Sequence, residues 1–374
     1  MKILIEKNSL VQGLSQVQRA IATKNTLPIL SGVLLEAQEN QITFTASDQE
    51  LTLSSSVEAQ VQEPGKILLP ARNLLELAKR FPPGTVSISL DPFSPGIKIN
   101  YGHSEIVLNS MDSDQFPTFP LAPEQNLFSI NSQDLKNMIK RVSISISPDH
   151  ARPVFSGALF EKNSQGILSM ASTDTHRLSV VKQEGIPFFS ENSLLKMLIP
   201  GRTLNELFRL IEEDDLVHFG LVNNQLLVSF GRTILISRLI DGQFPNYQQV
   251  IPTEWCSKVI IDTQIFLEAV ERASLIAREE NKNRTNFIML ELKTGFLEID
   301  SNSPEIGRIH EEIPAICDGE DMKIIFNAKY LLDGLKVMET EQLTIKFTGP
   351  SSAAVLMPKE ENNFIYLLLP IRIQ

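Results

Sequence analysis

The string Leu69-Pro70-Ala71-Arg72 returns twice along this chain of 374 residues, as Ile199-Pro200-Gly201-Arg202 and, more faintly, as Phe326-Asn327-Ala328-Lys329. A second set of residues recurs at one offset: Pro28, Ser31, Gly32 and Leu34 return as Pro153, Ser156, Gly157 and Leu159. Self-similarity at a fixed period indicates copies of one structural unit. We therefore expect three similar domains, at residues 1–124, 125–254 and 255–374.

Each copy carries two helical patterns among several strand patterns. Apolar residues at spacings of three and four predict helices within the windows 7–24, 71–80, 134–141, 201–213, 264–278 and 327–338. Alternating apolar and polar residues predict half-buried strands at 41–45, 226–230 and 295–299. Strands outnumber helices too strongly for alternating crossovers. We expect an α+β fold in which the helices pack on one face of antiparallel sheets.

The composition is that of a globular protein, with 42% hydrophobic and 21% charged residues. The two cysteines, Cys256 and Cys317, form neither a disulfide framework nor a metal-binding spacing, which favours a reducing compartment. Charged residues interrupt the first apolar run too early for a secretion signal, and no run of eighteen apolar residues predicts a membrane span. We expect a soluble, cytoplasmic protein.

The charge is distributed unevenly along the chain. The formal net charge of −11 argues against a protein that coats nucleic acid with its whole surface. Basic residues nevertheless outnumber acidic ones over the six predicted helices taken together. Helices from the three units presented side by side would form a basic surface suited to phosphates, without base reading. A compact three-domain protein with ordinary solvated helix faces is the alternative.

Four strings carry a resemblance to a known family: Thr26-Leu27-Pro28-Ile29-Leu30, Thr173-Asp174-Thr175-His176-Arg177-Leu178, Asp241-Gly242-Gln243-Phe244-Pro245-Asn246-Tyr247 and Leu369-Pro370-Ile371-Arg372. In this order, and with three repeats of this length, the whole chain resembles the bacterial DNA polymerase III β subunit, the DNA sliding clamp. The resemblance implies the DNA clamp fold, with two chains joined head to tail in a ring. It also implies a processivity subunit of the polymerase holoenzyme, itself non-catalytic and without a cofactor, that encircles duplex DNA.

Such a ring has room for DNA. Twelve helices spaced by about 9 Å would enclose a hole of roughly 24 Å, which admits a B-form duplex and a layer of water. By position, the DNA-facing residues of the family correspond to Lys24, Arg72, His150, Arg152, Arg202 and Arg209. The charge of the predicted helices adds Lys79, Arg80, Lys136, Lys140, Arg141 and Lys336. Gln248 and Gln249 replace two arginines of an enteric relative.

The family also implies an apolar cleft between the second and third domains. It docks short linear motifs of the DNA polymerase III catalytic subunit, the clamp loader, other polymerases and repair proteins. The corresponding residues are Arg152, Phe155, Thr173, Thr175, His176, Arg177, Leu178, Pro245, Val250, Asn327, Tyr330, Ser352, Leu367, Leu369, Pro370, Ile371 and Arg372. Without the resemblance, Leu367, Leu369 and Ile371 favour a final strand with one face in the core. Thr175 and Val154 depart from a glycine and a tyrosine of some relatives.

Ring closure would join an edge of the first domain to an edge of the third. The resemblance implies that Ile106 and Leu108 of one chain meet Leu275 and Ile276 of another. Their alternative role is in an ordinary core. The sequence departs from better-known relatives at the flanking positions 103 and 105, where it carries His103 and Glu105 instead of basic residues.

One enzymatic alternative starts from the string Asp174-Thr175-His176, in which a carboxylate would orient a histidine base beside a serine nucleophile. No Gly-x-Ser-x-Gly string supports this hydrolase hypothesis. The five histidines show no metal-ligand spacing, and no glycine-rich phosphate-binding loop occurs. We therefore favour a non-catalytic clamp and expect no metal site.

Overall fold

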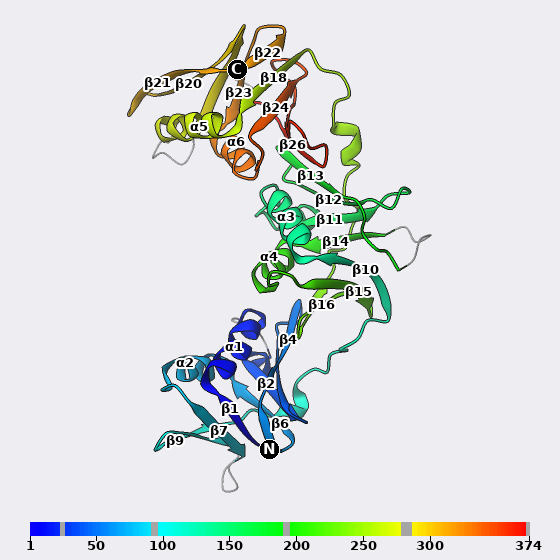
Figure 1. The fold of residues 1–374 in the computed structure, drawn as a ribbon, viewed down its shortest axis with the longest axis vertical. Coiled ribbons are helices and arrows are strands. Elements are labelled where there is room, and N and C mark those ends of the chain that lie inside the picture. Colours follow the sequence, from blue (N-terminus) through cyan, green and yellow to red (C-terminus); the bar gives the residue numbers. More distant parts are fainter. Residues whose placement is uncertain (23–26, 91–95, 190–194, 278–285, 372–374) are drawn as a thin grey trace. The chain divides into compact units, whose positions relative to one another are not determined.

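The computed structural model describes residues 1–22, 27–90, 96–189, 195–277 and 286–371. The elements of the first repeat are β1 (Lys2–Glu6), α1 (Lys7–Val17), β2 (Gly32–Gln38), β3 (Gln41–Ser47), β4 (Leu51–Glu58), β5 (Gln60–Glu63), β6 (Gly65–Pro70), α2 (Ala71–Arg80), β7 (Thr85–Leu90), β8 (Gly96–Tyr101) and β9 (Ser104–Asn109). Figure 1 shows these elements in blue and cyan.

The second repeat comprises β10 (Gln125–Asn131), α3 (Ser132–Ser143), β11 (Gly157–Lys162), β12 (Leu168–Thr173), β13 (Arg177–Gln183), β14 (Lys196–Pro200), α4 (Gly201–Leu210), β15 (Leu216–Val222), β16 (Gln225–Phe230) and β17 (Thr233–Arg238). The third comprises β18 (Ser257–Asp262), α5 (Thr263–Ala277), β19 (Phe287–Lys293), β20 (Phe296–Ser303), β21 (Gly307–Pro314), β22 (Ile316–Gly319), β23 (Met322–Asn327), α6 (Ala328–Leu335), β24 (Gln342–Phe347), β25 (Ala354–Pro358) and β26 (Phe364–Leu368).

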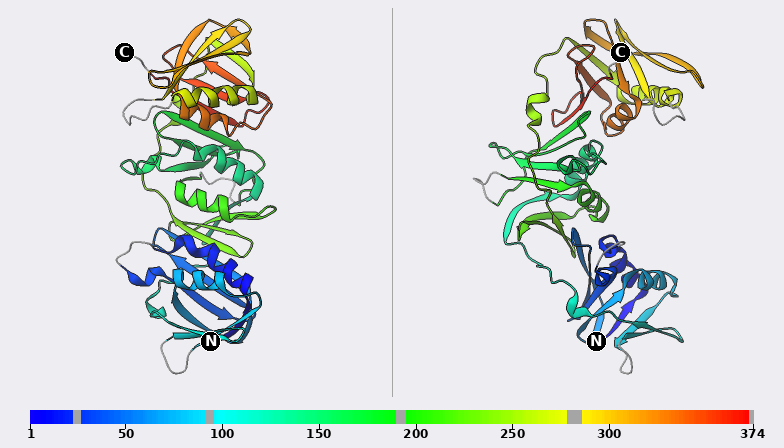
Figure 2. Two further views of the ribbon diagram at one scale, coloured as in Figure 1. Left: turned by 90° about the vertical axis from the view of Figure 1, so that its left-hand side faces the viewer. Right: turned by 180° about the vertical axis from the view of Figure 1, so that it is seen from behind.

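The three repeats share one order of elements. Each runs strand, helix, three strands, one further strand, helix, three strands. Among the strands of the described residues, only β5 and β22 are additional to this order. The helices contact one face of their own strands: α1 lies against β3 and β4, and α5 against β19, β20 and β21 (Figures 1 and 2). The α+β fold of three similar units expected from the repeats is therefore confirmed.

The helices form where the sequence spacing predicts them, and their burial explains why. In α2, Leu74, Leu75 and Ala78 are buried, whereas Lys79 and Arg80 at its end are exposed. The basic end complements the negative pole of the helix. The first predicted window extends too far, because α1 ends at Val17 and Ile21 already has extended backbone. No described helix has the length and apolar character needed to cross a bilayer.

The sheets extend beyond single repeats, which sequence analysis does not predict. The eight-stranded sheet has the order β10-β15-β16-β17-β4-β3-β2-β6, so that β17 of the second repeat pairs with β4 of the first. The nine-stranded sheet has the order β14-β11-β12-β13-β26-β25-β24-β18-β22, and its β13 pairs with β26 of the third repeat. The remaining sheets are β5-β1-β7-β8-β9 and β21-β20-β19-β23. All pairings are antiparallel.

The chain accordingly divides into two compact units that differ from the three repeats. One unit comprises Met1–Gln133, Pro187–Glu191 and Glu206–Leu239, and the other comprises Asp134–Ile186, Asn192–Asn205 and Ile240–Gln374. The division passes through the second repeat because each long sheet holds half of its strands. Each unit is described below by itself.

Candidate functional site

An apolar cluster on the nine-stranded sheet brings together residues that lie far apart in the sequence. Leu178 of β13 and Leu367 of β26 are direct partners across the ladder, and both are buried. Phe244 and Tyr247 pack into the same cluster, and the half-buried Phe155 packs against it. The cluster therefore combines predicted cleft residues from the second and third repeats.

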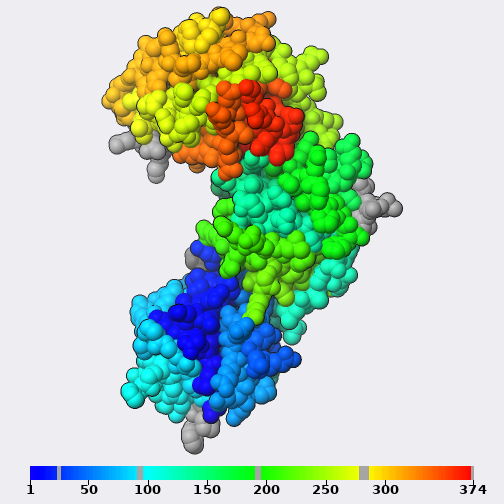
Figure 3. All heavy atoms as spheres, viewed as in Figure 1, coloured from blue at the N-terminus to red at the C-terminus, as the bar shows by residue number. Residues whose placement is uncertain are grey.

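Exposed apolar side chains border this cluster. Val250 is 58% exposed and Leu369 is 43% exposed, and Pro245 is exposed beside the buried Phe244. Backbone bonds fix the last segment: Leu369 N donates to His176 O at 2.9 Å, and Ile371 N donates to Ile325 O at 2.8 Å. The C-terminal end of the chain, red in Figure 3, forms part of the surface drawn there. Such exposed apolar groups beside a fixed backbone suit the docking of a short peptide.

A tight turn positions the polar residues of this surface. Asp174 Oδ1 accepts from the backbone N–H groups of His176 and Arg177 at 3.0 Å each, and Thr173 Oγ1 donates to Arg177 O at 2.6 Å. Thr175 at the tip has φ of 78°, a left-handed conformation that glycine adopts more easily. The threonine at this position therefore costs conformational energy, which the hydrogen bonds of the turn offset.

Arg177 is held by carboxylates on both sides. Its Nε lies 2.9 Å from Asp174 Oδ2, its Nη1 lies 2.6 Å from Asp333 Oδ2, and its guanidinium stacks 4.3 Å from the ring centroid of Tyr330. Desolvation alone would lower the pKa of Arg177, but Tyr366, Asp333 and Asp174 raise it above its ordinary value. Arg177 therefore connects the turn to α6 through its two carboxylate partners and is not a free cation for a ligand. Sequence analysis misses Asp333, because nothing local links α6 to the turn before β13.

The other predicted cleft residues have varied environments. The Asn327 side chain caps α6 by accepting from Lys329 N and Tyr330 N, so its oxygen is engaged. The His176 and Tyr330 rings are stacked with centroids 6.2 Å apart. Ser352 is exposed, Pro370 is half-buried, and Arg372 lies outside the described residues. Arg152 is exposed and forms no ion pair with another described residue, so it is a cation available to a ligand.

The geometry of the same turn contradicts the hydrolase hypothesis. Both Asp174 oxygens are occupied, one by backbone N–H groups and the other by Arg177. The carboxylate bonds the backbone of His176 and not its ring, so it does not orient the imidazole as a general base. The described residues also contain no group of three or more histidine, cysteine, aspartate or glutamate side chains able to hold a metal ion.

Most of the basic residues predicted to face DNA are exposed on or beside the helices: Arg72, Lys79 and Arg80 of α2, Arg202 and Arg209 of α4, Lys336 after α6, and His150 and Arg152 in the loop after α3. Lys136 and Lys140 of α3 are half-buried. Several have acidic neighbours, with N–O distances of 2.7 Å for Arg80–Glu76, 3.8 Å for Lys79–Glu76, 2.5 Å for Lys140–Glu339, 3.2 Å for Lys336–Glu271 and 3.9 Å for Arg209–Glu206. These helix surfaces therefore carry many cations, and carboxylates of the same chain partly neutralise several of them.

Arg141 departs from the role that the helix charge indicates. It is 7% exposed, its Nη2 lies 3.3 Å from Glu361 Oε2, and its guanidinium lies 5.2 Å from the ring centroid of Phe364. A buried, paired arginine is not available to a phosphate, so we exclude it from the DNA-facing set. Lys24 lies outside the described residues.

The predicted dimer residues lie on a terminal strand of one sheet and near the end of one helix. Ile106 and Leu108 are half-buried on β9, the terminal strand of the five-stranded sheet. Leu275 is 57% exposed and Ile276 is half-buried near the end of α5. The contact between them joins two copies and stays a prediction.

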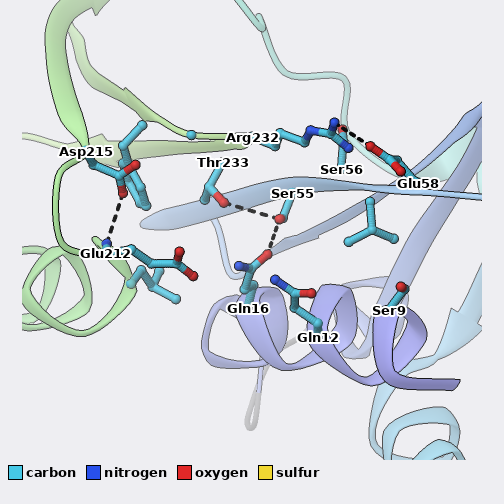
Figure 4. A pocket seen from close by; sticks show the side chains of 14 residues that line it. Ser9, Gln12, Gln16, Ser55, Ser56, Glu58, Glu212, Asp215, Arg232 and Thr233 are labelled. Carbon is cyan, nitrogen blue, oxygen red and sulfur yellow. Dashed lines mark hydrogen bonds and ion pairs between the residues drawn. The ribbon is translucent and has the colours of Figure 1, made fainter. Parts of the chain in front are cut away.

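A polar pocket of about 360 Å³ lies beside the pairing of β17 with β4. Figure 4 shows Gln16 of α1, Ser55 of β4 and Thr233 of β17 directed toward one another. Thr233 Oγ1 donates to Ser55 Oγ at 3.2 Å, and Ser55 Oγ donates in turn to Gln16 Oε1. Arg232 Nη2 lies 2.8 Å from Glu58 Oε1. These bonds connect the first and second repeats, so the pocket lining has a structural role.

Comparison with known proteins agrees with this architecture. Residues 1–120, 129–246 and 248–372 match the N-terminal, central and C-terminal domains of the DNA polymerase III beta subunit. The beta sliding clamp of Bacillus subtilis is 33% identical over 384 residues, with 100% of both chains covered. That of Staphylococcus aureus is 33% identical over 388 residues, covering 100% of this chain and 99% of the relative.

Solved structures give the same result. The crystal structure of the DNA polymerase sliding clamp from Bacillus subtilis has a TM-score of 0.94 at 32% identity, with 100% of each chain covered. A sliding clamp from Pseudomonas aeruginosa bound to griselimycin has a TM-score of 0.92 at 30% identity, with the same coverage. Since three consecutive domain matches cover nearly the whole chain, and full-length relatives share both its sequence and its fold, the chain belongs to the family of the DNA polymerase III beta subunit, the beta sliding clamps.

Proposed function

We propose that the chain is a sliding clamp that encircles duplex DNA and tethers the replicative polymerase to its template, without catalysing a reaction itself. The observation that carries this proposal is the threefold repetition of one unit, with β17 paired to β4 and β13 paired to β26 at the two junctions. A head-to-tail pairing that recurs between equivalent elements is the means by which protein rings are built. The three domains are residues 1–124, 125–254 and 255–374, and the ring is cytoplasmic, where a bacterial chromosome is copied.

Closure of the ring requires a second copy. At both internal junctions, the last strand of one repeat pairs with a strand of the preceding repeat. That strand is the third of the three strands that follow the first helix of its repeat. The pairs are β17 with β4 and β26 with β13. The strands in the two equivalent positions that are left, β9 and β21, both end their sheets. Two copies joined by two β9–β21 contacts would pair both of these terminal strands. Ile106 and Leu108 on β9 then meet Leu275 and Ile276 of the other copy.

DNA is held by topology with few phosphate contacts. The DNA-facing set comprises Lys24, Arg72, Lys79, Arg80, Lys136, Lys140, His150, Arg152, Arg202, Arg209 and Lys336. The acidic neighbours of many of these residues keep the contacts weak. Weak, exchangeable contacts are what sliding requires, because strong neutralisation of many phosphates would fix the protein on one site.

The apolar cluster and its exposed border dock linear motifs of the polymerase catalytic subunit, the clamp loader, other polymerases and repair proteins. The buried floor, the exposed Val250 and Leu369 and the cation of Arg152 supply both anchors and orientation for an extended peptide. The griselimycin complex of the Pseudomonas aeruginosa clamp supports ligand binding by a relative.

Retention on DNA tests the proposal. The chain is loaded onto a circular duplex by the clamp loader and separated from free protein by gel filtration, before and after the circle is cut once. We expect retention on the circle and rapid loss from the linear product, because a ring slides off a free end. Equal loss from both forms would contradict the clamp function.

A further inference from the structure

The internal junctions determine which residues would face each other where two copies meet. In the pairing of β4 with β17, Thr52 lies opposite Ile236, and Ser54 lies opposite Ile234. If β21 and β9 repeat this pairing, their register follows once each residue is matched to its counterpart. This register rests on the proposed ring and extends it to this chain's own side chains.

The first match relates β4 to β21. The strands β2 and β3 are joined by a two-residue turn that closes on the pair Gln38 and Gln41, and β19 and β20 are joined by one that closes on Lys293 and Phe296. Gln41 and Phe296 therefore occupy the same position. Counting along each strand, Ser47 corresponds to Asn302. Their cross-strand partners are Thr52 and Arg308, so these two residues correspond.

The second match relates β17 to β9. Two-residue turns again precede both strands, closing on Phe230 and Thr233 in one repeat and on Tyr101 and Ser104 in the other. Thr233 and Ser104 therefore correspond, and Ile236 corresponds to Val107. The two strands also direct apolar side chains to the same face under this match. Leu235 is buried, and its counterpart Ile106 is a half-buried apolar residue.

Combining the two matches gives the register of the intermolecular ladder. Arg308 lies opposite Val107, Ile309 opposite Ile106, and His310 opposite Glu105. Successive residues on a strand alternate between faces, so Glu105 and His310 lie on the same face of the joined sheet. One position further out on that face, His103 comes next to Glu312. The sequences His103-Ser104-Glu105 and His310-Glu311-Glu312 are thus antiparallel, with each histidine beside a glutamate.

We propose that the two copies are held together by these reciprocal histidine–glutamate pairs, Glu105 with His310 and His103 with Glu312, which makes ring closure depend on pH. A shift of the ladder by two residues toward Glu312 would place Glu105 opposite that glutamate, where like charges repel. The pairs therefore disfavour this slipped register.

The surroundings of His310 agree with a protonated, paired histidine. From β20, Asp300 Oδ1 lies 3.1 Å from His310 Nδ1 and Glu298 adds a second carboxylate; on β21, Glu312 lies 3.7 Å from Nε2, beside Arg308. The hydrogen bond and charge of Asp300 already raise the pKa of His310 within one chain. On the other copy, Glu105 Oε2 lies 3.2 Å from Lys98 Nζ, so this carboxylate would interact with both Lys98 and His310.

The sign of the effect follows from these contacts. A histidine whose pKa is higher in the dimer than in the free chain takes up a proton on association. The protonated histidine stabilises the dimer fully below the pKa that it has in the free chain. This stabilisation is lost as the pH rises through the pKa that the histidine has in the dimer. Since the ordinary value is about 6.5, the dimer should weaken from near neutral pH upward.

Sedimentation equilibrium of the full chain at low salt, without DNA, tests the proposal between pH 6 and 9. We expect the dimer dissociation constant to rise about three- to tenfold over this range, the size of one or two exposed ion pairs. Glu105→Gln and His310→Gln should each weaken the dimer at pH 6 and flatten the pH dependence.

A matched control separates this inference from the ring itself. His218→Gln removes an exposed histidine of β15. It should leave both the dimer dissociation constant and its dependence on pH unchanged. A wild-type dimer whose constant does not respond to pH, to Glu105→Gln or to His310→Gln would overturn the inference and leave the clamp intact. A chain that stays monomeric at every concentration would instead refute the proposed ring.

Discussion

Two buried arginines illustrate how side chains far apart in the sequence determine which charges are available. Arg177 binds Asp333, and Arg141 binds Glu361, with both guanidinium groups also stacked on aromatic rings. Helix charge correctly places cations on α3, but it cannot show that the carboxylate of Glu361 reaches Arg141 from across the fold. The family strings assign several residues of 173–178 to the predicted cleft, whereas the contact of Arg177 with Asp333 of α6 is visible only in three dimensions.

The pair with Asp333 predicts an effect on ligand binding. In Asp333→Asn, Arg177 loses one carboxylate, and Tyr330 loses part of the support that fixes its ring. We expect a linear-motif peptide of the polymerase catalytic subunit to bind the proposed docking surface about three- to tenfold more weakly, equivalent to about 1 kcal/mol, as measured by the emission of Trp255. This tryptophan is the single one in the chain and packs against the apolar cluster.

Glu361→Gln is the control for that substitution, because it breaks a similar arginine–carboxylate pair that does not contact the predicted cleft residues. Both variants should lower the free energy of unfolding by about 1–3 kcal/mol, but only Asp333→Asn should change the binding constant. Equal losses of affinity in the two variants would mean that Asp333 acts through stability alone.

At the scale of single elements, local patterns give helices and strands more reliably than they give partners. The spacing of apolar residues predicts all six helices, because burial of one face is a local property of the sequence. The continuation of the sheets across repeats is not predicted, because pairing of β17 with β4 depends on segments far apart in the chain. For the same reason, the register in which the edge strand β9 would pair can be inferred only by comparing the folded repeats.

Close approach of a helix to its sheet gives an element-scale prediction. A Cβ atom on Gly334 of α6 would lie 2.3 Å from the ring of Tyr366, which is fully buried. Alanine usually stabilises a helix relative to glycine by about 1 kcal/mol, but here we expect Gly334→Ala to destabilise the protein by about 1–3 kcal/mol through overpacking. Urea denaturation measures this. Asn205→Ala at an exposed position of α4 should cause no comparable loss, and a stabilised Gly334→Ala would contradict the close contact.

At the scale of the whole molecule, an acidic chain can still surround DNA because its basic residues gather on helices. Many of these residues have acidic partners, whereas Arg72 and Lys136 form no ion pair with another described residue. The net charge of −11 therefore gives little information about the surface that faces DNA.

This difference predicts which cations matter. Arg72→Gln and Lys136→Gln should each reduce the salt dependence of DNA binding, by up to about one unit of slope per phosphate contact. Lys140→Gln and Lys336→Gln remove cations already neutralised by Glu339 and Glu271, so their effect should be smaller. Fluorescence anisotropy with a short duplex at several salt concentrations measures the slopes. Equal effects of all four substitutions would show that the internal pairs open on DNA.

The eight-stranded sheet has a consequence for how this protein can be divided. Its strands come from two repeats, so a fragment ending after the first repeat would leave β4 without its partner β17 and expose a new edge to solvent. Unprotected edges of this kind promote aggregation. We therefore expect an isolated copy of the duplicated segment to aggregate, so that the boundaries visible in the sequence are a record of ancestry and not of autonomous folding.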